Sequence, residues 1–292
     1  MSRALIAYFS QAGSTARVAE AIAGGLEDAG YETDLRQIGL DAPRDPGCYD
    51  VIGIGAPVYY YRLPFNVSDY IRNLPDLGGT PVFGFLLQGT HRFDAGNRLR
   101  HALARKGGRA VGYFNCRGQA YYLGHLKEGY LFSPDHPTAE DLTQAKAFGR
   151  DVAGRVVSGG YVTPADEPAP PAIYRLERLL LSRWLIQHVC SRLFRVDPAK
   201  CTACGVCMDT CPTTNVRKDD SGRPVWGRDC LFCMSCEMNC PEDAISSFMS
   251  RPSTRWLMRP FLKYHVRHWS REDDLEYVRV VHERGETRRL ER

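Results

Sequence analysis

The chain has 292 residues, of which 43% are hydrophobic and 25% charged, and its formal net charge is +4. These values predict an ordinary globular protein of about two domains. The first apolar run covers only residues 4–9, which is too short for a secretory signal. No stretch of about eighteen apolar residues is free of charge, so the composition excludes a membrane-spanning protein. We therefore expect a cytoplasmic protein without a transmembrane segment.

Short apolar runs alternate with helical patterns over residues 1–160, which predicts an α/β domain with a parallel, doubly wound sheet. Five such runs predict the strand order 2-1-3-4-5, with a ligand beyond the carboxyl ends of the strands. The expected strands cover residues 4–9, 31–38, 50–55, 81–87 and 109–116. The expected helices cover residues 16–29, 64–74, 97–106 and 138–157, the last opened by a capping box.

Three loops at the strand ends are the candidate cofactor site. The first is rich in hydroxyl groups and glycine and runs into a helix N-terminus, which is a phosphate site that needs no lysine. The second offers aromatic faces, and the third follows the fourth strand. Phosphate binding beside aromatic side chains suits flavin mononucleotide (FMN). The candidate residues are Ser10, Gln11, Ala12, Gly13, Ser14, Thr15, Pro57, Val58, Tyr59, Tyr60, Gln88, Gly89, Thr90 and Gly96.

Two of these loops also resemble a known family. Residues 6–22 read Ile-Ala-Tyr-Phe-Ser-Gln-Ala-Gly-Ser-Thr-Ala-Arg-Val-Ala-Glu-Ala-Ile, which is similar to the flavodoxin FMN fingerprint, and residues 53–59 resemble its second flavin loop. Ala12 departs from the fingerprint, because many flavodoxins have a hydroxyl group there. The resemblance implies a flavodoxin-like fold with bound FMN. A dinucleotide fingerprint is absent from residues 10–15.

A linker and a connecting helix are expected over residues 161–196. The proline-rich part, residues 164–171, predicts an extended and exposed chain. Residues 173–196 have helical propensity, and their charges are spread around the helix. Because a helix that is apolar on most sides is usually buried, we expect it to pack between two domains. Contact of this basic, Trp184-bearing segment with a membrane surface is the alternative, which we do not favour here.

Eight cysteines form two copies of one pattern, C-x2-C-x2-C-x3-C-P. This is the run of bacterial ferredoxins, in which the fourth cysteine ligates the other 4Fe–4S cluster. It predicts two clusters in a small α+β module over residues 197–249. Zinc sites use two short knuckles and a disulfide framework needs an oxidising compartment, so neither suits this repeat. One predicted ligand set is Cys201, Cys204, Cys207 and Cys240, and the other is Cys230, Cys233, Cys236 and Cys211.

The remaining features carry less information. Cys48, Cys116 and Cys190 are expected to be buried, small apolar residues. The extension over residues 250–292 has eleven basic and seven acidic residues, with aromatic residues such as Trp269 among them. We expect it to fold back onto the acidic cluster module. Two clusters and one FMN would make the loaded protein slightly negative, so we expect no binding to nucleic acid.

The whole arrangement resembles the prokaryotic flavodoxin–ferredoxin fusion proteins. The matching segments outside the fingerprints are residues 196–197, 211–215 and 222–226. The resemblance implies an electron-transfer protein that relays electrons between the clusters and FMN to partner proteins, namely a donor and an acceptor reductase. No catalytic residues emerge, so an electron carrier is favoured over an enzyme. The alternatives are an FMN-dependent reductase with a substrate pocket formed by Phe93, Tyr121 and Tyr122, and a redox sensor.

Overall fold

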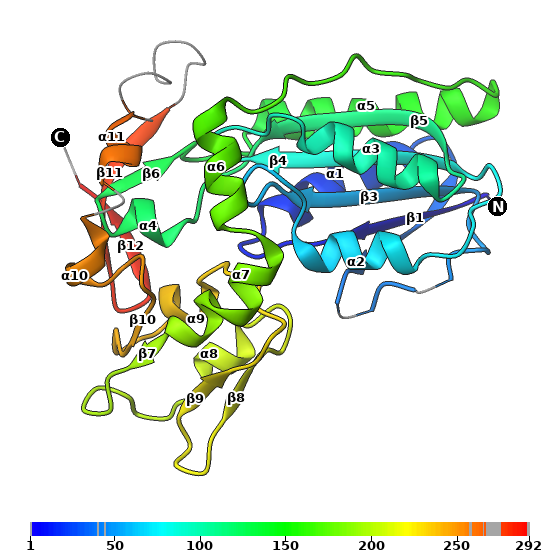
Figure 1. Cartoon of the computed structure of the whole chain (residues 1–292). Coiled ribbons are helices and arrows are strands. Elements are labelled where there is room, and N and C mark those ends of the chain that lie inside the picture. The colour runs from blue at the N-terminus through cyan, green and yellow to red at the C-terminus, as the bar shows by residue number, and fades with distance from the viewer. Residues whose placement is uncertain are drawn as a thin grey trace. The chain divides into compact units, whose positions relative to one another are not determined.

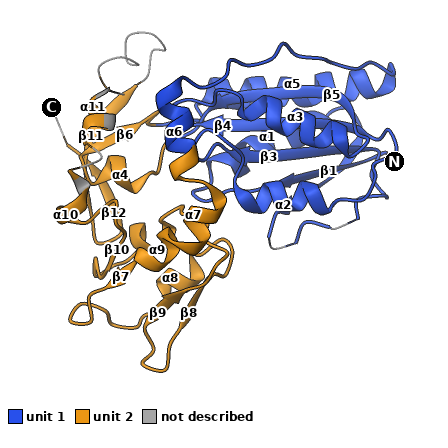
Figure 2. Cartoon of the chain, in the orientation of Figure 1, with its two compact units in different colours: residues 1–119, 135–178 blue, residues 120–134, 179–292 orange. Residues whose placement is uncertain are grey.

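The computed structural model describes residues 2–39, 41–43, 45–256, 259–264, 266 and 276–290. The chain divides into two compact units (Figure 2). Unit 1 contains residues 1–119 and 135–178, and unit 2 contains residues 120–134 and 179–292. No helix among the described residues is long and apolar enough to cross a membrane.

Unit 1 is built on a five-stranded parallel sheet with the order β2-β1-β3-β4-β5, which confirms the predicted fold class and strand order (Figure 1). Residues buried on both faces of the sheet explain why the strands read as nearly continuous apolar runs. The strands are β1 (Ser2–Tyr8), β2 (Tyr31–Gln37), β3 (Val51–Pro57), β4 (Pro81–Gln88) and β5 (Arg109–Arg117).

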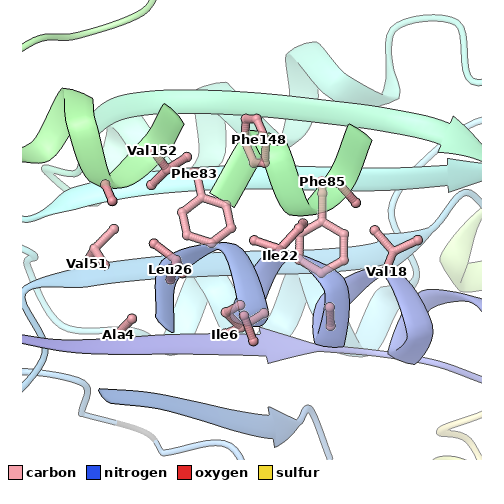
Figure 3. Packing of buried hydrophobic residues seen from close by; sticks show 14 of the residues in the cluster. Ala4, Ile6, Val18, Ile22, Leu26, Val51, Phe83, Phe85, Phe148 and Val152 are labelled. Atoms are coloured by element: carbon pink, nitrogen blue, oxygen red, sulfur yellow. The ribbon is translucent and has the colours of Figure 1, made fainter. Parts of the chain in front are cut away.

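Helices cover both faces of this sheet. On one face, α1 (Ser14–Glu27) and α5 (Ala139–Val157) pack on Phe83 and Phe85 of β4 (Figure 3). The ring of Phe85 lies across Gly55, where an added Cβ would be 1.9 Å from Phe85 Cζ, so the close approach requires glycine. The other face carries α2 (Phe65–Asn73) and α3 (Ala95–Arg105).

Helix α5 begins with the capping box that the sequence predicts. The Thr138 hydroxyl accepts a hydrogen bond from the Asp141 amide at 3.2 Å, and the Asp141 carboxylate accepts one from the Thr138 amide at 2.7 Å. Two backbone donors of the first turn are thereby satisfied, which fixes the start of the helix.

The connecting segment is not one helix. It consists of α6 (Ala172–Leu180), α7 (Arg183–His188) and the 3-10 helix η1 (Cys190–Leu193). The break lies at Ser182, whose hydroxyl accepts a hydrogen bond from the Leu185 amide and starts a new helix. On α6, Leu176 and Leu179 are exposed, while the Arg178 side chain pairs with Asp94 within unit 1.

Unit 2 contains the cysteine-rich module. A hairpin in this module pairs β8 (Val216–Lys218) antiparallel to β9 (Pro224–Trp226). A second antiparallel pair joins β7 (Arg195–Val196) to β10 (Ile245–Ser246). Two single-turn helices, α8 (Val206–Asp209) and α9 (Ser235–Met238), each contain the third cysteine of a run, Cys207 and Cys236.

A further sheet in unit 2 joins distant parts of the sequence. Its order is β12-β11-β6, where β6 (Tyr130–Phe132) follows the fifth strand of unit 1, and β11 (Tyr277–Glu283) and β12 (Glu286–Arg289) belong to the C-terminal extension. The division of the chain therefore differs from the expected boundary at residue 160. The remaining short helices are α4 (Leu123–Leu126), α10 (Pro252–Arg255) and α11 (Arg259–Tyr264).

The extension contacts the cysteine-rich module through Arg284, whose amide donates to Asp243 at 2.9 Å. Lys127, from the segment before β6, also pairs with Asp243 at 3.2 Å. These contacts agree with the expectation that the extension folds back onto the module. Trp269 lies outside the described residues.

Candidate functional site

The three candidate loops of unit 1 lie at one edge of the sheet. The Phe9 amide, just after β1, donates to the Gly55 carbonyl at 2.9 Å. The Val58 amide, just after β3, donates to the Leu87 carbonyl at 2.8 Å. Because β1, β3 and β4 are neighbours in the sheet, their carboxyl ends bring residues 10–15, 57–60 and 88–90 together.

The first loop forms the N-terminus of α1. Gly13 has a φ of +86°, and an added Cβ would meet no heavy atom within 4 Å, so the loop faces open space. The Ser10 hydroxyl accepts a hydrogen bond from the Ala16 amide at 3.4 Å, which holds the loop over the helix end. The first turn has no acidic residue, and Ser14 and Thr15 add hydroxyl groups. These features suit an anion such as a phosphate.

The second loop is a tight turn. The Tyr59 and Arg62 backbones exchange two hydrogen bonds at 2.9 and 3.0 Å, and Tyr60 and Tyr61 both have left-handed backbone angles. The Tyr59 hydroxyl donates to the Gln11 side chain, and its ring lies edge-on to Phe9. The first two loops are therefore linked by side chains. Pro57, Val58, Tyr59 and Tyr60 are half-buried, which leaves part of each surface for a ligand.

The third loop begins at Gln88, which is buried at the end of β4. Its side-chain oxygen has no hydrogen-bond partner among the described residues. A buried amide oxygen without a partner is costly, so a ligand with a polar edge would stabilise it. Gly89 and Thr90 are half-buried beside it. The residues of the three loops thus fit a phosphorylated, flat ligand such as FMN.

Gly96 has a different environment from the one expected. Its amide donates to the Glu167 carboxylate at 2.8 Å, and an added Cβ would lie 2.3 Å from the Tyr113 hydroxyl. Arg92 also pairs with Glu167, at 2.6 Å, and the Tyr113 hydroxyl donates to the same carboxylate at 3.2 Å. The Glu167 carboxylate of the linker therefore occupies the backbone N–H of Gly96, and the place of Gly96 in the cofactor site stays a prediction.

His91, which follows Thr90 of the third loop, is buried. Only 8% of its surface is exposed, and its ring stacks on Phe93 at 5.4 Å. Burial, helped by the charge of Arg117, lowers the pKa of His91 to about 4. The side chain is therefore neutral at pH 7.

Helix α6 completes this cluster from the linker side. Tyr174 is 1% exposed and contacts Tyr61 and Phe93 with ring centroids 4.9 and 5.2 Å away. Arg178 forms a bidentate ion pair with Asp94 and donates to the Tyr61 carbonyl. The sequence did not indicate these contacts, because the partners are far apart along the chain. Asp94 and Arg178, for example, are separated by 84 positions.

Glu177 gives unit 1 a pH-dependent stability. Burial raises its pKa to about 7, against the opposing effects of the Tyr61 hydroxyl and the charge of Arg62. The unfolded carboxyl releases its proton near pH 4.3, so the folded state binds the proton more tightly. The free energy of unfolding therefore falls as the pH rises from about 4.3 to 7.

We expect Glu177→Gln to be as stable as the wild type at pH 4.5 and more stable by about 2–3 kcal/mol above pH 7. Urea unfolding at a series of pH values measures this difference. Glu20→Gln, at an exposed carboxylate of α1, is the control and should show no such trend. An equal gain for Glu177→Gln at all pH values would contradict the assignment.

The cysteines of unit 2 line two separate cavities. About 370 Å³ of space free of protein atoms is bordered by Cys201, Cys204, Cys207 and Cys240. About 300 Å³ is bordered by Cys211, Cys230, Cys233 and Cys236. Each cavity therefore combines three cysteines of one run with the fourth cysteine of the other run. No three His, Cys, Asp or Glu side chains in the described part of the chain are arranged around one mononuclear ion.

Left-handed residues shape the two cluster loops. Ala203 and Gly205 have φ angles of +55° and +92° in the first loop, and Phe232 and Met234 have +56° and +58° in the second. Such angles turn backbone N–H groups toward the inside of a loop. The Phe232 amide donates to the Cys230 sulfur at 3.3 Å.

Other donors also approach the sulfur atoms. The Trp226 indole N–H donates to Cys236 at 3.4 Å, and the Asn215 amide donates to Cys211 at 3.3 Å. The Ala244 amide donates to Cys240 at 3.3 Å. Hydrogen bonds to cluster sulfurs are one of the means by which a protein tunes a reduction potential.

The electrostatics of these thiols fit a cluster. Burial raises the pKa of Cys207 to about 11 and that of Cys230 to about 12. Without a cation, such thiols stay protonated at neutral pH, and bound iron supplies the charge that stabilises the thiolates. The four-thiol cavities and their N–H donors therefore fit 4Fe–4S clusters.

The three other cysteines lie outside both cavities. Cys116 and Cys190 are buried as expected, and burial raises the pKa of Cys116 to about 12. Cys48 is exposed, which the sequence did not predict. It follows residues 45–47, which belong to no helix or strand.

Comparisons with known proteins match both parts of the chain. A family model for a flavodoxin domain matches residues 5–124, and a family model for a 4Fe–4S dicluster domain matches residues 200–245. No curated protein matches the chain.

Similar solved structures include a flavodoxin from the domain Archaea, with 20% identity, coverage of 53% of this chain and 99% of that chain, and a TM-score of 0.42. Oxidised Flavodoxin 2 from Bacillus cereus has 23% identity, the same coverages and a TM-score of 0.42. The flavodiiron protein from Giardia intestinalis has 19% identity, coverage of 53% of this chain and 36% of that chain, and a TM-score of 0.39.

Proposed function

This chain is a flavodoxin–ferredoxin fusion, and from that premise we propose its function. We propose that it relays electrons between two 4Fe–4S clusters and FMN to a partner reductase. A chain that joins these two domains is a flavin and iron–sulfur electron-transfer protein. The observation that carries the finer proposal is the pair of four-cysteine cavities in unit 2. We propose a cytoplasmic location and redox proteins as donor and acceptor.

When bound, each cluster carries one electron and FMN carries one or two, so together they convert between one- and two-electron chemistry. The chain's own residues bind and orient these groups. Residues 10–15 would hold the phosphate, Tyr59 would border the ring, and the Gln88 side-chain oxygen would accept a hydrogen bond from its polar edge. The eight cavity cysteines would ligate the clusters.

The alternative of an FMN-dependent reductase requires a substrate pocket formed by Phe93 and by Tyr121 and Tyr122. Phe93 packs on His91 and Tyr174 within unit 1. The Tyr122 hydroxyl donates to the Met249 sulfur at 3.1 Å within unit 2. Both side chains are engaged inside their own unit, which favours the carrier.

The relay predicts electron transfer within one chain. Because both carriers share a tether, their encounter has a high effective concentration. We expect that flavin reduced by light under argon passes electrons to the clusters at a first-order rate that does not change on tenfold dilution. Absorbance and electron paramagnetic resonance follow the clusters.

The control is a Cys211→Ser, Cys240→Ser double variant that keeps its flavin, photoreduced by itself and then mixed in the dark with oxidised wild type. Photoreduced flavin in this variant can reduce only another molecule's clusters, so that rate should fall in proportion to dilution. If the wild-type rate falls in the same way, the relay within one chain is wrong.

A further inference from the structure

Helix α6 carries its apolar side chains on its outer face. Leu176, Leu179 and Leu180 are 55%, 66% and 56% exposed, and Ile173 is 38% exposed. Tyr174 on the opposite side is 1% exposed. Large apolar side chains exposed together on one helix face mark an interaction surface.

The inner face of the same helix is unusually polar. Arg178 pairs with Asp94, and the Tyr61 hydroxyl donates to Glu177 at 3.3 Å. On a surface helix, charges normally face water and leucines face the protein. Here the anchoring contacts are polar and aromatic, so the leucines are not needed to hold α6 on unit 1. Their outward position requires another explanation.

The residues that follow α6 have the same character. Trp184 of α7 is 62% exposed, and Val189 and Leu193 are 39% and 41% exposed. Residues 172–196 contain five arginines and one glutamate, and that glutamate is the half-buried Glu177. Arg175, Arg192 and Arg195 are exposed. The segment therefore presents leucine, tryptophan and arginine to its surroundings without an exposed carboxylate.

We propose that residues 173–193 dock on an anionic lipid surface. Exposed leucines insert into the boundary between headgroups and acyl chains, tryptophan favours that boundary, and arginines bind anionic headgroups. With nine residues, α6 lies on the membrane and does not cross it. The positive charge and the tryptophan favour lipid over an apolar protein groove. This inference is independent of the proposed relay.

Co-sedimentation of the holoprotein with vesicles tests the proposal. One set contains phosphatidylcholine only, and the other contains phosphatidylcholine with about one-third phosphatidylglycerol. We expect stronger binding to the anionic vesicles. Replacing Leu176 and Leu179 together with Gln should weaken binding at least tenfold, because each loses most of its apolar transfer energy. Arg175→Gln should weaken it about fivefold.

Val157→Gln is the matched control, because Val157 is 84% exposed but lies on α5. It should bind vesicles like the wild type. Absence of binding to anionic vesicles would overturn the proposal, as would binding that the leucine replacements leave unchanged. Sedimentation equilibrium without lipid covers the remaining case: a dimer that Leu176→Gln and Leu179→Gln dissociate would assign the surface to a second copy of the chain, and the lipid proposal would be wrong.

Discussion

Replacing Cys211 with serine is expected to remove about four of about eight irons per chain, and the lost cluster should be the one held by Cys230, Cys233 and Cys236. Cys211 precedes that run by nineteen positions but lines its cavity. Cys240→Ser should remove the other cluster, because Cys240 lines the cavity of Cys201, Cys204 and Cys207. Iron analysis and electron paramagnetic resonance of the anaerobically purified protein measure both losses.

Two comparisons make this result specific. Cys48→Ser, at an exposed cysteine outside both cavities, should keep the full iron content. The cluster that remains in Cys211→Ser should give a different electron paramagnetic resonance spectrum from the cluster that remains in Cys201→Ser, since Cys201→Ser affects the opposite cavity. If Cys211→Ser and Cys201→Ser remove the same cluster, each run ligates its own cluster and the crossed assignment is wrong. Zinc in place of iron in the wild type would contradict the cluster assignment itself.

Replacing Asp94 with alanine is expected to lower the stability of unit 1 by about 3–5 kcal/mol, because it leaves a largely buried cation without its partner. The side chains of Arg178 and Asp94 are 12% and 20% exposed. Burial alone would raise the pKa of Asp94, but the hydrogen bond and charge of Arg178, with the charge of Arg98, lower it below its usual value. Arg62 lies close to the same site, and burial together with the charge of Arg178 lowers its pKa to about 10.

The measurements are the urea midpoint by circular dichroism and hydrogen exchange of the α6 amides, which should become much faster. Asp151→Ala is the control, because Asp151 pairs with Arg155 across an exposed turn of α5 at 3.7 Å. It should cost no more than about 0.5 kcal/mol. Equal losses for Asp94→Ala and Asp151→Ala would show that the pair does not anchor α6.

The sequence by itself determined the features that depend on local patterns. Apolar runs of strand length, separated by helical segments, predicted the five-stranded sheet and its order, because parallel strands need crossover helices. Thr138 and Asp141 predicted a helix start, since a capping box involves residues only three positions apart. The spacing of the cysteines predicted two groups of four, and the two cavities contain the same groups.

The tertiary structure alone decided how the linker and the extension are used. Arg92 and Glu167 are separated by 75 residues, and neither position follows a periodic pattern that would predict the pair. The pairing of β6 with β11 joins a three-residue strand from the middle of the chain to a seven-residue strand near its C-terminus. The outward leucines of α6 have the same cause: which face of a helix is buried depends on its partner, and here Asp94 and Tyr61 select the polar face.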